Sequence, residues 1–100
     1  MILRLITYDI EDNRYRHKLA KKLEAFGFIR VQYSVFCGTH TVTQWERCWE
    51  ALQKIHCQYG CETDKIYVII VSKKMFRAMQ RIGPAPATGM ILSEEITMWV

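Results

Sequence analysis

Apolar and polar residues alternate along this chain with two different periods, and the switches between them predict its elements. Strand-forming residues gather in five segments, at residues 2–8, 29–36, 39–42, 65–71 and 96–100. The segment KIYVIIV at 65–71 has the clearest strand composition. A turn at Cys37-Gly38 is expected to separate the second segment from its short neighbour. The sequence therefore predicts four strands in the first 71 residues and a fifth at the C-terminus.

Helical spacing fills the gaps between these strands. Tyr15, Leu19, Leu23 and Phe26 form one apolar stripe, with Asp12 or Asn13 as the capping residue and Gly27 as the stop. A second stripe follows later in the chain, formed by Trp45, Cys48, Trp49, Leu52 and Ile55. This spacing predicts two long amphipathic helices.

Local signals set the limits of the second helix and predict one more. Thr43 and Glu46 have the spacing of a capping box, and Gly60 ends the second helix. A short basic helix is expected over residues 73–81, followed by a GPAPATG loop.

The order strand, helix, strand, strand, helix, strand predicts an α+β fold. It fits a ferredoxin-like βαββαβ sandwich with both long helices on one face of the sheet, and residues 96–100 as an extra C-terminal strand. The length of 100 residues suits one domain, residues 1–100. The segment at 66–71 is apolar on both faces, so the second sheet face needs a cover. We expect a second copy, giving a homodimer; the alternative is that the C-terminal segment folds back over its own sheet.

Composition excludes some classes of protein. No apolar run has the length of a membrane span, and the N-terminal MILRLITYDIED lacks the features of a signal peptide. We therefore expect a cytoplasmic protein with no membrane partner. In that compartment the four cysteines are expected to be reduced rather than paired. A zinc site would combine Cys37, His40, His56, Cys57 and Cys61, but the sequence has no paired C-x-x-C motifs, which disfavours it.

Basic residues are unevenly distributed. Residues 14–30 hold six Lys and Arg against Glu24 alone, in a chain whose net charge is +4. Candidate contacts with a nucleic-acid backbone are Arg14, Arg16, Lys18 and Lys22, with Arg77 from the second basic segment at 73–81. The bland alternative is a solvated helix face. Tyr8, Tyr33, Phe36 and Tyr67 could stack bases, but no RNA-recognition motif accompanies them, so sequence-independent contact is the better prediction.

Asp9 follows a buried strand and is the main candidate for chemistry. Alone it is most simply a turn acid. In a two-fold dimer, however, two Asp9 carboxylates could share one Mg²⁺ or Mn²⁺, and such an ion could activate water at a phosphate.

The first 38 residues also carry a resemblance. Tyr8-Asp9-Ile10, Arg14-x-Arg16, Phe26-Gly27 and the run Arg30 to Phe36 (RVQYSVF) resemble the second CRISPR-associated adaptation protein family, the small partners of the CRISPR integrase that are often named endoribonucleases. The resemblance implies a ferredoxin-like dimer whose C-terminal strand crosses to the partner. A strand at residues 96–100 that pairs with the partner's sheet would itself place Met98 or Trp99 against apolar surface. The resemblance also implies a metal between two Asp9 residues.

The same resemblance implies a role and further residues. It implies a dimer that bridges integrase subunits and supports duplex DNA, with Arg14 and Arg16 on the backbone and Ser34 and Phe36 near the dimer centre as structural residues. Cys37-Gly38 replaces an acidic position of the family, which weakens a second metal carboxylate. Three hypotheses follow: a spacer-acquisition scaffold, a metal-dependent nuclease acting through paired Asp9 residues, and a ribonuclease toxin or RNA-binding module of the same fold.

Overall fold

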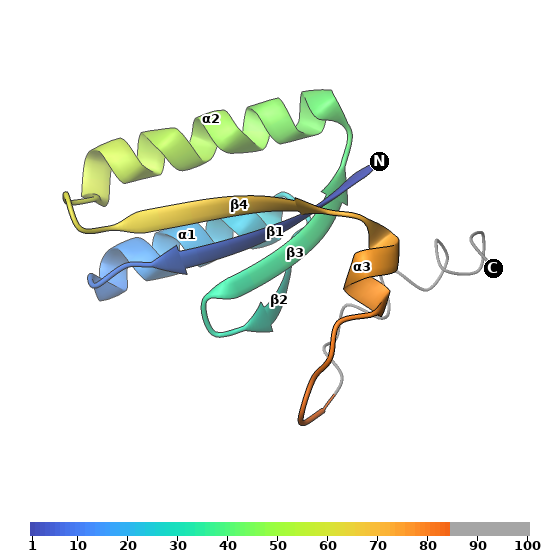
Figure 1. Ribbon diagram of the computed structural model, residues 1–100. Coiled ribbons are helices and arrows are strands. Elements are labelled where there is room, and N and C mark those ends of the chain that lie inside the picture. The colour runs from blue at the N-terminus through green and yellow to red at the C-terminus, as the bar shows by residue number, and fades with distance from the viewer. Residues whose placement is uncertain (85–100) are drawn as a thin grey trace.

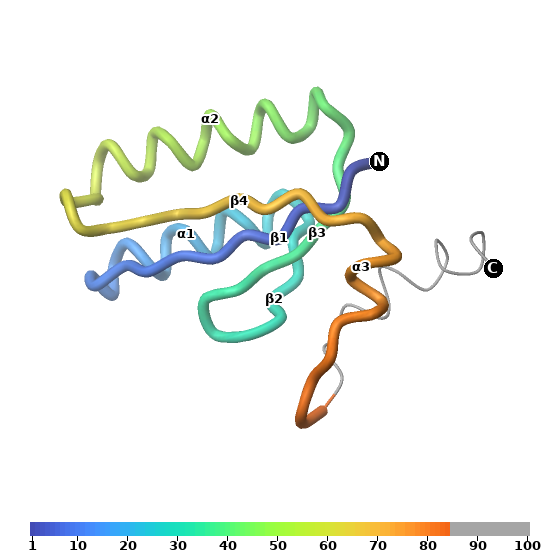
Figure 2. Tube along the Cα trace, in the orientation of Figure 1, coloured from blue at the N-terminus to red at the C-terminus, as the bar shows by residue number. Residues whose placement is uncertain are grey.

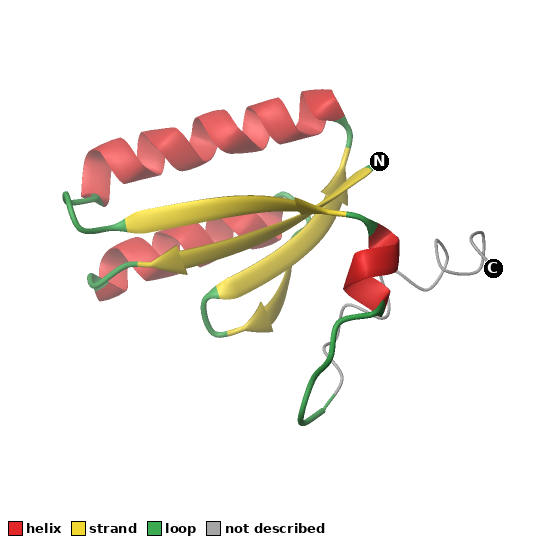
Figure 3. Cartoon of the chain, in the orientation of Figure 1, coloured by secondary structure: helices red, strands yellow, loops and turns green. Residues whose placement is uncertain are grey.

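The computed structural model describes residues 1–84, so the predicted strand at 96–100, with Met98 and Trp99, lies outside the described part of the chain. The elements follow one another as β1 (Ile2–Asp9), α1 (Asn13–Ala25), β2 (Ile29–Gln32), β3 (Val35–His40), α2 (Val42–Tyr59), β4 (Lys65–Val71) and α3 (Lys73–Arg77) (Figure 1). The first six are the predicted ferredoxin-like βαββαβ order, which is confirmed (Figure 3).

The four strands form one sheet in the order β2-β3-β1-β4, and each neighbouring pair is antiparallel. Strand β1 is central, with Ile6 opposite Phe36 of β3 on one side and Val68 of β4 on the other. Strands β2 and β4 form the two edges. The last pair in the β1–β4 ladder joins Asp9 to Lys65, so the end of β1 lies beside the start of β4.

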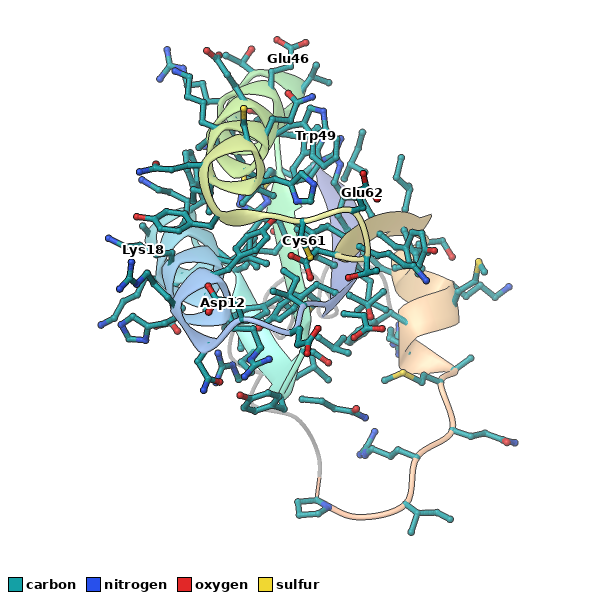
Figure 4. All side chains as sticks on the ribbon, turned by 90° about the vertical axis from the view of Figure 1, so that its left-hand side faces the viewer. Asp12, Lys18, Glu46, Trp49, Cys61 and Glu62 are labelled. Atoms are coloured by element: carbon teal, nitrogen blue, oxygen red, sulfur yellow. The ribbon has the colours of Figure 1, made fainter. Side chains whose placement is uncertain are left out.

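Both long helices cover one face of the sheet, as predicted. They lie on one side of the strands in Figure 4, and α3 lies on the other side. The main core is built between the two helices and this sheet face, from Ile6, Tyr8, Ile10, Tyr15, Leu19, Ala20, Leu23, Phe28, Phe36, Cys48 and Leu52. The predicted stripe of α1 faces inward as expected, because Tyr15, Leu19 and Leu23 have no exposed surface.

The second sheet face is covered at one end only, within the described residues. Phe76 of α3 packs there with Leu3 and Cys37. The chain then continues from α3 to Pro84 (Figure 2), and residues 79–82 line a hollow of about 600 Å³ against Leu5, Val31 and Val35. At the other end Tyr67 and Ile69 remain 59% and 43% exposed. The alternative in which the C-terminal segment folds back over its own sheet concerns residues outside the described part of the chain, and within residues 1–84 an apolar area remains open.

The predicted boundaries around the β2–β3 hairpin were wrong. Residues 29–36 do not form one strand: the chain turns at Tyr33-Ser34, and β3 runs straight through the expected Cys37-Gly38 turn. The β2–β3 register shifts between Arg30 and Gln32, which marks a bulge. Gly38 was misread because a buried strand glycine and a turn glycine look alike in sequence.

The helix ends show why local signals are ambiguous. Asp12 caps α1 through a hydrogen bond from the Tyr15 amide, and Gly27 ends it with a φ of 85°. The capping box of α2 lies two residues earlier than predicted, with Thr41 and Gln44 in place of Thr43 and Glu46. Helix α3 ends at Arg77 rather than at residue 81. In the part of the chain that the structure describes, no helix combines the length and apolar character needed to cross a membrane.

Candidate nucleic-acid interface

Asp9 is the last residue of β1, and its side chain is exposed. Because strand residues alternate between faces, Asp9 shares the open face with Leu3, Leu5 and Thr7. Across residues 1–84, no three His, Cys, Asp or Glu side chains converge into a group that could hold a metal ion. Asp9 therefore belongs to no such group among these residues, and Lys65 lies opposite it in the ladder. Within residues 1–84 of one copy, the surroundings of Asp9 thus do not fit a divalent ion.

The strand around Asp9 is fixed by the β2–β3 turn. The Tyr8 amide donates to the Ser34 carbonyl (3.1 Å), and the Tyr8 hydroxyl donates to the Tyr33 carbonyl (3.3 Å). Phe36 is fully buried and stacks against Tyr8 with ring centroids 6.2 Å apart. Ser34 and Phe36 thus hold the end of β1 through backbone and core contacts.

Arg30 completes this cluster and was not singled out from the sequence. Its guanidinium lies 5.0 Å from the Phe36 ring centroid and 5.8 Å from that of Tyr33. Burial raises the pKa of the Tyr8 hydroxyl, and the nearby Arg30 charge offsets part of that rise. The signal that could have identified Arg30 is its position opposite Phe36 in the β2–β3 ladder, which only the strand register reveals.

The predicted basic residues of α1 divide into two kinds. Arg14, Lys18 and Lys22 are exposed and have no ion pair with the residues that the structure describes. Lys18 extends from the outer surface of α1, away from the sheet (Figure 4). Arg16 is different, because its guanidinium donates to the carbonyl oxygens of Ile10 and Glu11 and to the side chain of Asn13. Its hydrogen-bonding capacity is directed into the protein.

Helix α2 adds cations that sequence reasoning missed. A groove of about 390 Å³ runs between the two long helices and is lined by Lys22 of α1 and by Arg47 and Lys54 of α2. Glu50 pairs with Lys54 at 3.4 Å, which leaves Lys22 and Arg47 as the unpaired charges of the groove. The α2 cations are separated in sequence by acids, so they did not form a basic run.

The two basic segments do not meet within one copy. Arg77 lies on α3, which packs on the sheet face opposite to α1 and α2 (Figure 4). The helix layer and α3 therefore form separate basic areas.

Comparison with known proteins gives a family match and several similar sequences. The family model described as CRISPR associated protein Cas2 matches residues 1–79. A protein of Methanospirillum hungatei named CRISPR-associated endoribonuclease Cas2 1 is 50% identical over 67 residues, which are 67% of each chain. One from Synechocystis, CRISPR-associated endoribonuclease Cas2 3, is 36% identical over 88 residues, covering 88% of this chain and 91% of the other.

Solved structures with similar names also match this chain over most of its length. Streptococcus pyogenes Cas2 superposes with a TM-score of 0.69 at 26% identity, covering 81% of this chain and 99% of the other. A chain of a partial Cas6-RT-Cas1–Cas2 complex has a TM-score of 0.71 at 28% identity, covering 87% and 97%.

Proposed function

The chain belongs to the Cas2 family, and we propose that it acts in CRISPR adaptation as a dimeric scaffold that holds duplex DNA by its backbone beside integrase subunits. The observation that carries this proposal is the division of charge at the surface. Among residues 1–84, exposed cations without ion pairs gather on the helix layer, whereas Asp9 belongs to no group of three potential metal ligands. Such a surface suits binding better than cleavage by one copy.

Backbone contact follows from the kind of residues present. Lysine and arginine release condensed counterions when they approach phosphates, and this term carries no sequence information. Arg14, Lys18, Lys22 and Arg47 project from the helix layer, and Arg77 offers a separate contact on α3. The four candidate stacking aromatics do not form one platform: Phe36 is buried, Tyr8 is 5% exposed, and Tyr67 lies on the open face of β4.

A second copy is the proposed cover for the open part of the sheet. Tyr67 and Ile69 are exposed there beside half-buried Leu5 and Val35. A two-fold dimer through this face would bury these residues and would bring the ends of the two β1 strands into one assembly. Residues 96–100 would add a strand across the dimer.

An integrase partner is supported by the superposed complex, which contains a Cas1–Cas2 assembly. Co-purification with the candidate integrase and a DNA integration assay test this step. We place the assembly in the cytoplasm, as the sequence predicts.

A second candidate function is metal-dependent cleavage by the dimer. It is favoured by the exposure of Asp9 at the end of β1 and by the name endoribonuclease of the relatives. Two Asp9 carboxylates are hard oxygen ligands of the kind that Mg²⁺ or Mn²⁺ prefers, and a bound ion would supply Lewis-acid chemistry at a phosphate. Asp9→Asn should then abolish cleavage of RNA or DNA while the dimer stays folded. Undiminished cleavage by the folded Asp9→Asn dimer excludes this candidate.

Salt dependence tests the DNA-binding proposal directly. A Lys18→Gln, Lys22→Gln variant should bind duplexes of different sequence equally less tightly, and its log–log salt slope should fall by about 1.8 for each copy if both cations contact phosphates. Lys74→Gln with Arg77→Gln removes the same charge from the opposite side of the sheet, so it tests separately whether α3 also contacts the duplex. An unchanged slope in the first variant would show that the outer surface of α1 faces solvent in the complex.

A further inference from the structure

We propose that Asp64 is a positioning residue for the candidate site, because it fixes the loop of residues 10–12 that joins Asp9 to α1. This inference rests on the proposed function, in which Asp9 and Arg14 flank that loop at a functional end of the molecule. Figure 4 looks straight at this end and labels Asp12, Cys61 and Glu62. Asp64 belongs to the turn between α2 and β4, far from Asp9 in sequence.

The Asp64 carboxylate bridges two segments. One oxygen accepts a hydrogen bond from the Glu11 amide at 3.3 Å, and the other accepts from the Cys61 amide at 2.9 Å. The backbone ladder between β1 and β4 ends at the pair Asp9 and Lys65. Asp64 precedes Lys65, so its side chain continues the connection between the two segments beyond the last backbone pair.

Arg16 holds the same loop from the other side. One terminal nitrogen of its guanidinium donates to the carbonyl oxygens of Ile10 (2.5 Å) and Glu11 (2.7 Å). The Ile10 side chain is 4% exposed and packs in the main core, which anchors the loop from below. The polar backbone groups of residues 10 and 11 are thus bound by two charged side chains of opposite sign.

The two contacts act on one peptide segment. Asp64 holds an amide of the loop and Arg16 holds its carbonyls, and the Asp12 side chain then caps α1 at the Tyr15 amide. A functional group needs its supporting residues to be locked if it is to keep its geometry. Releasing Asp64 should therefore loosen the direction of both Asp9 and Arg14, although Asp64 itself touches neither ligand nor substrate.

This role makes a prediction of unusual sign. Removing an acidic side chain from a protein that binds DNA ordinarily strengthens binding, because it removes repulsion from phosphates. If Asp64 positions the loop, its removal should weaken binding instead. The salt slope should stay the same, since no cation that meets phosphate is lost.

The experiment compares Asp64→Ala with Glu62→Ala in the full-length chain. Glu62 is an exposed acid of the same turn, so both variants change the net charge equally. Amide hydrogen exchange by NMR should be about tenfold faster at Glu11 in Asp64→Ala and unchanged in Glu62→Ala. Affinity for a duplex of fixed sequence should fall about three- to tenfold in Asp64→Ala alone, at an unchanged salt slope.

Two further variants keep the proposal testable if Asp64→Ala does not fold. Asp64→Asn retains one acceptor and should show a smaller change in both measurements. Arg16→Lys keeps the charge but loses the planar fork, and it should weaken duplex binding as Asp64→Ala does. If Arg16→Lys binds duplex DNA as tightly as the wild type, Arg16 acts through its charge on phosphates and does not position the loop of residues 10–12.

The outcomes separate this inference from the proposed function. If hydrogen exchange at the Glu11 amide is unchanged in Asp64→Ala, the hydrogen bond from that amide to Asp64 does not hold the loop, whether or not the protein binds DNA. Faster exchange with affinity equal to that of Glu62→Ala overturns the positioning role. If the wild-type protein does not bind duplex DNA at all, the proposed function fails, while the exchange measurement still decides whether Asp64 holds the loop.

Discussion

Replacing Gly38 by alanine tests how tightly β3 is packed against the helix layer. A Cβ atom at this position would lie 2.9 Å from Cε1 of His40 and 2.9 Å from Cδ1 of Phe28. Carbon atoms in good contact are about 3.5–4.0 Å apart. The added methyl group therefore needs both rings to move by more than half an ångström, on the order of the shortfall in those contacts.

Neither ring has room to move. Phe28 and His40 stack with centroids 4.4 Å apart, and they are 3% and 5% exposed. His40 is also held by a 2.5 Å hydrogen bond between Nε2 and the Phe26 carbonyl. Overpacking of this kind costs about 1–3 kcal/mol, and alanine regains about 0.4–1 kcal/mol by restricting the unfolded chain. The midpoints of these two ranges give an expected net loss of about 1.3 kcal/mol.

Urea unfolding at a fixed protomer concentration measures this loss, because association with a second copy would otherwise change the apparent stability. Each 1 kcal/mol should lower Tm by about 4–8 °C in a domain of this size. Replacing the crowding Phe28 ring by the smaller leucine should relieve the clash. The double variant Gly38→Ala, Phe28→Leu should therefore lose less unfolding free energy than the sum of the losses in the two single variants. A Gly38→Ala protein as stable as the wild type, or additive losses in the double variant, would refute the packing argument.

Three further predictions address the core, the thiols and the tail. Burial raises the pKa of Tyr15 to about 12, so the stability that the neutral Tyr15 hydroxyl contributes should be complete below its ordinary pKa near 10 and should be lost as the pH rises towards 12. In thermal unfolding, Tyr15→Phe should no longer show this loss at alkaline pH, and it should be about 0.5–1.5 kcal/mol less stable at neutral pH because it lacks the 2.6 Å hydrogen bond to His56. Iodoacetamide at pH 8 should modify two thiols of the native protein and four after denaturation, as counted by mass spectrometry. Cys57 and Cys61 are exposed, whereas Cys37 and Cys48 are buried and their thiol pKa values are raised to about 11. Deleting residues 96–100 should shift the protein towards monomer or aggregate in sedimentation at micromolar concentration, and a tight soluble dimer would show that the tail serves another purpose.

The sequence predicted the fold because its strongest hydrophobic periodicities mark the helix and strand surfaces that are buried in the core. The stripe Tyr15, Leu19 and Leu23 is completely buried, and the segment 65–71 is a strand with the predicted limits. Burial of apolar surface rewards these patterns in any arrangement of the elements, so local spacing was sufficient. Asp9 could be chosen as a candidate for a similar reason, since a carboxylate that follows a buried strand stands out without knowledge of the tertiary structure, and its role stays a prediction.

Only the tertiary structure decided which residues meet across the fold. Gly38 lies in β3, where the stacked rings of Phe28 and His40 leave no space for a Cβ atom, and turn propensity contains no information on that contact. Arg16 reads as one more cation of a basic run, yet its donors bind the carbonyls of Ile10 and Glu11. Asp64 carried no signal at all, because its partner lies 53 residues away. Contacts at such separations depend on sheet order and register, and these follow from the packing of the whole chain rather than from any local pattern.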